Sequence, residues 1–283
     1  MIKTIYIARH GFRLNWQTNI WKSPTGYPRD PPLASYGDEQ AAELATYLSS
    51  LPEDQRPTAI YSSPYYRCLQ TVNPTANALD LPIHVEHGLS EWYSPVKEGT
   101  GLHPKPVPAE KLVPFFDRID PSYSPTFLVT RKGESVPDLY RRGEEFLAAF
   151  IQRLERDTSA SRHERILLVT HAATVITLAQ ALLGDESIRR TLRVGCCTLS
   201  TFDRVSDSVD GVPLGNSVWA PRGNLAIADF LTNGVERDWG MNDIEVLDGV
   251  VVEDDGVPGT QGEEDVAFGV QSWGSNSQSL SKM

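Results

Sequence analysis

Cysteine is scarce in this chain of 283 residues, which has only Cys68, Cys196 and Cys197. An odd number, two of them adjacent, gives no disulfide framework, and no C-x2-C pair exists for zinc. This favours a reducing compartment, in the cytoplasm or the nucleus. No apolar run approaches the ~20 residues of a membrane helix, and charge interrupts the first residues too early for a secretory signal. We therefore expect no membrane association.

Positive charge is scarce in the last part of the chain. The net charge is -11, and residues 205–283 hold 14 acidic residues against Arg222, Arg237 and Lys282. The first 204 residues are neutral. Direct binding to a nucleic-acid backbone requires clustered Lys and Arg, so nucleic acid is not an expected ligand.

Two hydrolase motifs are also absent. Gly-x-Ser-x-Gly, which marks many serine hydrolases, does not occur. Neither Cys68 nor Cys196 has an arginine six residues later, so the Cys-x5-Arg arrangement of cysteine-based phosphatases is missing. These absences disfavour serine and cysteine nucleophiles.

Hydrophobic residues make up 40% and charged residues 22% of the chain, which is typical of a globular protein. Strand patterns occur at residues 3–9, 58–62, 83–86, 166–170, 197–205 and 224–231. Helix patterns occur at 37–51, from the second strand to about 79 with an interruption near Pro74, from Ser135 or Asp138 onward, and at 172–183 before Gly184. Alternating strands and helices predict a three-layer α/β domain: a doubly wound, mainly parallel sheet with helices on both faces.

The expected organisation is one domain over residues 1–247 and a tail over 248–283. Residues 92–125 are dense in proline and long for a connector, so we expect an insertion that forms a lid or wall of a site. Acids, Gly, Ser and Gln dominate the tail, which predicts a solvated, disordered segment.

Four polar segments follow the predicted strands. They are Arg9-His10-Gly11-Phe12-Arg13, Ser62 to Arg67, Gly88 to Trp92, and Val169 to Ala173. Open α/β sheets bind ligands at the carboxyl ends of their strands. We therefore expect two imidazoles, three guanidiniums and one carboxylate at one edge of the sheet.

Such a set suits phosphoryl transfer. A neutral imidazole can attack phosphorus and divide the displacement into two steps. Arginines stay charged and bind phosphate oxygens bidentately, so no metal is required. A carboxylic acid can protonate the leaving oxygen.

The motifs together resemble the histidine phosphatase superfamily, with its phosphoglycerate-mutase-like fold. Besides Arg9-His10-Gly11, Leu33 to Ala41 is similar to the family's L-T-x-x-G-x-x-Q-A, and Ser63 to Thr71 is similar to its S-P-x-x-R-x-x-Q-T. Gly133-Glu134-Ser135 and the second histidine after a strand also resemble it. The resemblance covers roughly residues 1 to 205.

The resemblance implies the role of each site residue. His10 would be the phosphorylated nucleophile and Glu91 the acid/base, although an acid there could instead orient an arginine. Arg9, Arg67 and the catalytic candidate His171 would hold the phosphate. No cofactor or metal is implied.

Arg13 would also bind phosphate, or else form a salt bridge in the wall of the site. Arg-His-Gly-x-Arg is similar to acid phosphatases and to the ubiquitin-associated SH3-containing tyrosine phosphatases, which makes mutase activity less expected.

Three aromatic residues lie beside the motifs: Trp16, Trp92 and Tyr93. They could line a pocket for phosphotyrosine or another aryl phosphate, or they could be core packing under a proline-rich loop.

The primary hypothesis is a metal-independent phosphomonoesterase that acts on a phosphorylated small molecule or phosphoprotein. The residues Thr4 to Gly11, Glu91-Trp92-Tyr93 and the segment from Trp219 to Trp239 resemble a subunit of the fungal RNA polymerase III transcription factor complex, which gives one alternative. It is an interaction protein with weak activity that joins a complex through the tail or the segment from Trp219 to Trp239. Another alternative is a phosphoglycerate mutase.

Overall fold

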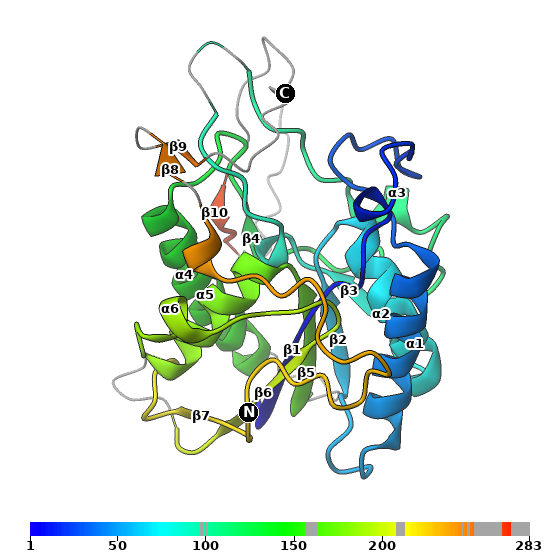
Figure 1. Ribbon diagram of the computed structural model, residues 1–283. Coiled ribbons are helices and arrows are strands. Elements are labelled where there is room, and N and C mark those ends of the chain that lie inside the picture. The colour runs from blue at the N-terminus through cyan, green and yellow to red at the C-terminus, as the bar shows by residue number, and fades with distance from the viewer. Residues whose placement is uncertain are drawn as a thin grey trace, which may run out of the picture.

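The computed structural model describes residues 1–96, 99, 101–156, 163–207, 213–244, 246–247, 250–251 and 268–272. Its centre is a six-stranded sheet with the order β3-β2-β5-β1-β6-β7 (Figure 1). The strands β3, β2, β5 and β1 are parallel, whereas β6 and β7 are antiparallel to their neighbours. Their bounds are β1 Thr4–Arg9, β2 Ala59–Ser62, β3 Ile83–Val85, β5 Arg165–Thr170, β6 Leu199–Arg204 and β7 Trp219–Pro221.

Alternation along the strands creates a core on each face of the sheet. On β1, Ile5 and Ile7 belong to one hydrophobic cluster, and Tyr6 and Ala8 belong to the other. Successive side chains of a strand point to opposite faces, so a continuous apolar strand suits a sheet that is covered on both sides.

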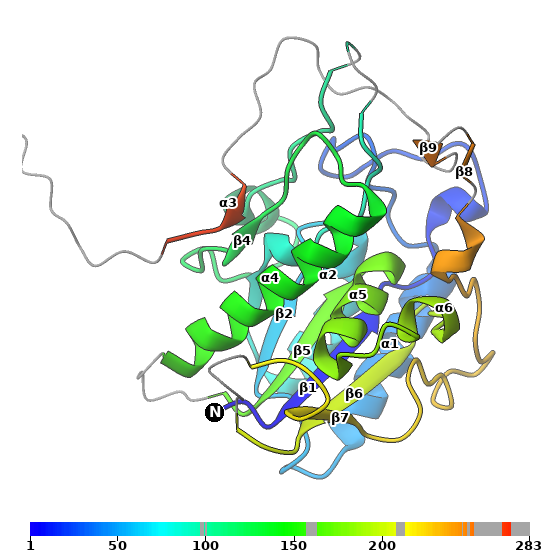
Figure 2. The same cartoon turned by 90° about the vertical axis from the view of Figure 1, so that its left-hand side faces the viewer.

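Helices cover both faces of this sheet. The helices α1 (Ser35–Ser50) and α2 (Tyr66–Leu79) lie on one face. The helices α4 (Val136–Arg156), α5 (Ala172–Leu183) and α6 (Ile188–Thr191) lie on the other (Figures 1 and 2). This confirms the predicted three-layer, doubly wound and mainly parallel architecture. Within the described residues, no helix has the length and apolar character needed to span a membrane.

The helix ends follow local sequence signals. Before α4, the Ser135 hydroxyl donates to the Asp138 carboxylate (2.6 Å) and accepts from its backbone N–H (3.3 Å), which forms a local cap where the helix was predicted to begin. The helix α5 ends at Gly184, whose φ of 60° suits glycine. The predicted interruption near Pro74 is wrong, because α2 continues through this residue to Leu79.

The predicted strand over 224–231 is also wrong. Of this segment only Ile227 forms a bridge, with Leu199. Ala226 has a φ of 51°, and this left-handed backbone breaks the extended conformation that a strand needs. The last strand of the sheet is instead β7, a few residues earlier.

Short elements complete the chain. They are η1 (Leu14–Trp16), η2 (His87–Leu89), α3 (Ala109–Leu112), β4 (Phe127–Leu128), η3 (Met241–Asp243), β8 (Val246–Leu247), β9 (Val250–Val251) and β10 (Gly269–Val270). The strand β10 pairs with β4, and β9 pairs with β8, so two short strands fall within the predicted tail. Apart from these two strands and residues 268, 271 and 272, residues 248–283 lie outside the described part of the chain, where the predicted disorder stays a prediction.

Candidate active site

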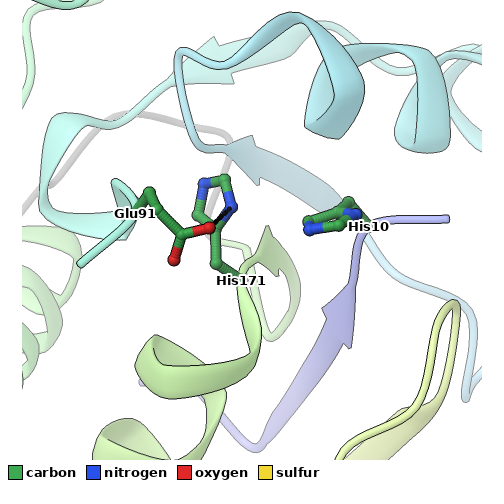
Figure 3. A group of neighbouring side chains, drawn as sticks. All are labelled: His10, Glu91 and His171. Carbon is green, nitrogen blue, oxygen red and sulfur yellow. Dashed lines mark ion pairs between the residues drawn. The ribbon is translucent and has the colours of Figure 1, made fainter. Parts of the chain in front are cut away.

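The four predicted segments meet at the carboxyl edge of the parallel strands. His10 follows β1, Arg67 lies in the first turn of α2, Glu91 follows η2, and His171 joins β5 to α5. The ring centroids of His10 and His171 are 5.4 Å apart. Figure 3 shows Glu91 and His171 side by side, with His10 beyond them at the end of β1. The structure therefore brings together the residues predicted to carry the chemistry, although their roles stay proposals.

Side chains from the other motifs hold the loop that carries His10. The Gly11 N–H donates to Thr71 Oγ1 (2.9 Å), and the Phe12 N–H donates to Gln40 Oε1 (3.0 Å). Gln70 Oε1 accepts from the Leu33 N–H (2.7 Å). Gln40 and Thr71 therefore hold the loop that carries His10, and Gln70 holds the backbone at Leu33, before α1.

His10 is buried and has a defined hydrogen bond. Its Nδ1 lies 2.8 Å from the Gly11 carbonyl oxygen, which can only accept. The proton therefore belongs on Nδ1, and Nε2 keeps its lone pair. Burial, together with the charges of Arg67 and Arg9, lowers the pKa of His10 well below its usual value. The ring is neutral at pH 7, as a nucleophile requires.

Arg67 is the central cation of the site and is almost completely buried. Its guanidinium contacts Asp30 Oδ1 (3.0 Å), Glu91 Oε2 (3.1 Å) and His171 Nδ1 (3.1 Å). Burial works to lower the pKa of Arg67, but the Asp30 and Glu91 carboxylates raise it above its usual value. Arg67 therefore stays charged in a buried position.

His171 is fixed from two sides. Its Nε2 lies 2.8 Å from Ser63 Oγ, and its Nδ1 lies 3.2 Å from Glu91 Oε2. Burial lowers the pKa of His171 to about 4 despite the neighbouring carboxylate. Glu91 shows the opposite balance: burial works to raise its pKa, but His171, Arg67 and His10 hold it well below its usual value. The resting site therefore contains an ionised Glu91 beside neutral histidines.

Hydrogen bonds from α4 hold the loop that carries Glu91. Arg142 donates to the carbonyls of Gly88 and Ser90, both at 3.1 Å, and its Nε lies 2.8 Å from Glu134 Oε1. The Trp92 indole donates to the Glu134 carbonyl (2.7 Å). A buried ion pair therefore sets the position of the Glu91 carboxylate.

Arg9 and Arg13 approach His10 from the side of Trp16. Arg9 is buried and donates to the carbonyls of Val194 (2.6 Å) and Arg237 (2.5 Å). The Arg13 guanidinium carbon lies 4.3 Å from the Trp16 ring centroid. Burial, together with Arg67, lowers the pKa of Arg13 to about 10. Two further cations therefore border His10.

The three predicted pocket aromatics occupy different positions. Trp16 lies 6.2 Å from His10, centroid to centroid. Tyr93 stacks on His103 (4.9 Å), and both line a cavity of about 20 Å³ that also reaches Glu91. Trp92 is tied to Glu134 and does not line this cavity. Part of the proline-rich insertion, including His103, thus forms a wall beside Glu91.

Sequence reasoning missed several residues of the site. Asp30, from the early Pro-rich loop, accepts from Arg67 and from the Tyr66 N–H (2.5 Å). Ser63 also belongs to the site, because its hydroxyl forms a hydrogen bond with His171 Nε2 (2.8 Å). The cap position of α2 is Tyr65, which makes no side-chain cap bond. Of these residues, only Ser63 could have been found from the sequence, because it is the first residue of the motif Ser63 to Thr71.

The site favours an anion over a metal ion. His10, Glu91 and His171 each offer a ligand atom, and these atoms lie within 4.8 Å of one another. However, both nitrogens of His171 already have partners, and Arg67 lies 3.1 Å from both Glu91 and His171. A guanidinium at this distance repels a cation and attracts a phosphate.

Comparison with known proteins gives consistent results. The chain is 37% identical over 264 residues to the transcription factor tau 55 kDa subunit of Saccharomyces cerevisiae, covering 86% of this chain and 59% of the relative. It is 27% identical over 250 residues to the ecdysteroid-phosphate phosphatase of Drosophila melanogaster, covering 74% of this chain and 31% of the relative. The chain therefore spans less than two thirds of these curated relatives.

Solved structures share the fold. The ecdysone phosphate phosphatase of Bombyx mori, in complex with tungstate, aligns with a TM-score of 0.54 and 18% identity over 78% of this chain and 98% of that one. A mycobacterial glucosyl-3-phosphoglycerate phosphatase with VO3 aligns with a TM-score of 0.51 and 17% identity, over 79% and 99%.

The family model of the histidine phosphatase superfamily (branch 1) matches residues 5–212, which include all four motif segments. With the phosphoglycerate-mutase-like sheet and the assembled Arg-His-Gly loop, this match shows that the chain belongs to the histidine phosphatase superfamily.

Proposed function

We propose that this protein is a metal-independent phosphomonoesterase that works through a phosphohistidine at His10. The observation that carries the proposal is the surroundings of its Nε2: a neutral imidazole with a fixed tautomer, bordered by buried arginines and by the Glu91–His171 pair. An uncharged nucleophile and fixed cations suit attack on a phosphate, whose negative charge would otherwise repel the attacking group.

In the first step, His10 Nε2 forms a bond to phosphorus while the bond from phosphorus to the ester oxygen breaks. Arg67 and Arg9 hold the phosphoryl oxygens as charge moves onto the leaving oxygen. Glu91, which takes a proton from solvent once the phosphate has bound, gives this proton to that oxygen. The phosphate that enters supplies negative charge next to Glu91, which raises the pKa of this carboxyl from its low resting value.

In the second step, water attacks the phosphohistidine and the bond from phosphorus to nitrogen breaks. The Glu91 carboxylate accepts the proton of the attacking water, and His10 is restored. The neutral His171 accepts from the Ser63 hydroxyl at Nε2 and donates from Nδ1 to the Glu91 carboxylate, which positions that carboxylate. The products are inorganic phosphate and an alcohol or phenol.

The proposed substrate class is an aryl phosphate, with phosphotyrosine as one member. Trp16 beside His10 and Tyr93 beside Glu91 offer apolar surfaces on two sides of the reacting groups. The phosphatases among the relatives support hydrolysis as the reaction.

Glu91→Gln tests the acid/base assignment. We expect hydrolysis of phenyl phosphate to slow by about 10²–10³-fold, because an alkyl or phenyl oxygen needs a proton as it leaves. Hydrolysis of p-nitrophenyl phosphate should slow much less in its first step, because its leaving group is stable as an anion. Burst kinetics would separate this step from dephosphorylation. Equal losses of the first step with both substrates would make Glu91 a residue that only orients Arg67.

Removal of divalent metal ions tests whether the activity is independent of metal. We expect the protein to keep its full rate with p-nitrophenyl phosphate after dialysis against EDTA, since arginines supply the positive charge. The rate should not rise when Mg²⁺, Mn²⁺ or Zn²⁺ is added back. Loss of activity in EDTA that a single divalent ion restores would contradict the mechanism.

A second proposed function is membership of a transcription factor complex in the nucleus, a role that requires no catalysis. The 37% identity to the tau 55 kDa subunit of Saccharomyces cerevisiae supports it. Purification of the tagged full chain, beside a form that ends at residue 247, distinguishes the two roles. A stable complex that forms equally with His10→Ala would support a structural role, and a chain that purifies alone would count against it.

A further inference from the structure

A fourth arginine, Arg237, lies at the border of the site and comes from beyond the residues that the family model matches. Its guanidinium carbon is 5.3 Å from the centroid of Trp16 and 5.6 Å from that of Phe12. Arg13 and Arg9 lie over the same Trp16 ring at 4.3 and 5.7 Å. Three guanidiniums therefore gather around one indole beside the nucleophile.

The backbone fixes Arg237 in this place. Its φ is 49°, a left-handed conformation that residues other than glycine rarely adopt. The carbonyl of Arg237 accepts from Arg9, the Glu236 carbonyl accepts from the Cys196 N–H (2.9 Å), and the Trp239 N–H donates to Val194 (3.1 Å). Such a strained conformation persists only where the surrounding structure holds it, and strained residues cluster at functional sites.

The side chain of Arg237 differs from its neighbours in exposure and in charge balance. Arg9 and Arg67 are buried, whereas Arg237 is exposed. In the described part of the chain no carboxylate forms an ion pair with it, although other exposed arginines such as Arg193 and Arg222 have such partners. Mutually repelling cations around one ring favour an anion between them.

We infer that Arg237 is a specificity-determining residue that binds a second anionic group of the substrate, separate from the ester phosphate. The inference rests on the proposed phosphatase function. The guanidiniums that act most strongly on His10 belong to Arg67, Arg9 and Arg13, so the reacting phosphoryl group already has its cations. Arg237 is exposed and its guanidinium carbon lies 5.3 Å from the Trp16 centroid, so it would meet an acidic substituent of an aryl phosphate whose ring packs on the indole.

The test compares substrates that differ only in this second charge. One pair is a phosphotyrosyl peptide with glutamate or glutamine beside the phosphotyrosine, and the other is carboxyl-substituted and unsubstituted phenyl phosphate. We expect Arg237→Ala to raise KM about 10-fold for the acidic member, the size of one charge-assisted hydrogen bond, with kcat unchanged. KM for the neutral member should stay within about 2-fold, and Arg237→Lys should restore part of the difference.

Two controls separate the possible explanations. Arg190→Ala removes an exposed arginine on α6 and should change neither KM. Alanine has a Cβ as arginine does, so the left-handed backbone is equally strained in Arg237→Ala, and its melting temperature should stay near that of the wild type.

The inference is overturned if Arg237→Ala changes both members of a pair equally or changes neither. If KM for the acidic member rises only in the peptide pair, the second anion belongs to a protein substrate. If it rises in both pairs, small molecules can also carry the second anion. Fluorescence anisotropy can measure the affinity of His10→Ala for each of the two peptides. This measurement tests Arg237 separately from catalysis. If the proposed phosphatase mechanism itself were wrong, the result would be different: hydrolysis would not depend on His10.

Discussion

His10→Ala should lower kcat for p-nitrophenyl phosphate by at least about 10⁴-fold, the scale of loss when a covalent nucleophile is removed. The reason is geometric. His10 alone combines a free Nε2, a proton fixed on Nδ1 by the Gly11 carbonyl, and a position among the guanidiniums of Arg9, Arg13 and Arg67. His171 cannot replace it, because both of its nitrogens already have partners.

The loss must be shown to be catalytic rather than structural. We expect His10→Ala to keep its circular dichroism spectrum and cooperative thermal unfolding, since the loop is held by Thr71 and Gln40 through backbone N–H groups. His84→Ala is a matched control, because His84 pairs with Asp120 away from the site and its loss should leave the rate unchanged. Wild-type activity in His10→Ala would refute the assignment of the nucleophile.

Arg67→Met should damage both activity and stability. The rate should fall by about 10²–10³-fold, as when one preorganised cation or donor is removed from a transition state. The free energy of unfolding should fall by about 3–5 kcal/mol, because the change leaves the buried Asp30 carboxylate without its partner. Urea unfolding and steady-state kinetics measure the two effects.

A double variant separates these two contributions. In Arg67→Met with Asp30→Asn, no uncompensated charge remains at the pair, and the Asn side chain can still accept from the Tyr66 N–H. We expect most of the stability to return while the activity stays low. Recovery of activity in the double variant would show that Arg67 acts only through folding and does not bind phosphate.

The parts of this site that the sequence predicts are those that lie at the ends of regular elements. His10 and His171 follow strongly apolar strands, and Arg67 opens a helix after another. Parallel strands place their carboxyl ends together, so their convergence follows from the topology alone. The end of α5 at Gly184 was equally predictable, because a glycine in the left-handed conformation ends a helix.

The residues that sequence reasoning missed lie in loops without periodicity. Asp30 reaches Arg67 from a segment rich in proline, and Arg237 reaches Trp16 across more than 200 positions. No spacing rule connects such residues, because their contacts depend on how separate loops pack. The same cause explains why Pro74 and residues 224–231 were predicted wrongly: tertiary packing tolerates a proline within α2, while a left-handed Ala226 prevents a strand.

The decisive measurement is identification of the covalent intermediate. The protein would be mixed with p-nitrophenyl phosphate, quenched within milliseconds in denaturant at alkaline pH, where phosphohistidine survives, and digested for mass spectrometry. We expect one phosphoryl group, on the peptide that carries His10 and on the imidazole itself, and none in His10→Ala. Rapid turnover with no phosphoryl group on His10, or with the group on another residue, would contradict the mechanism.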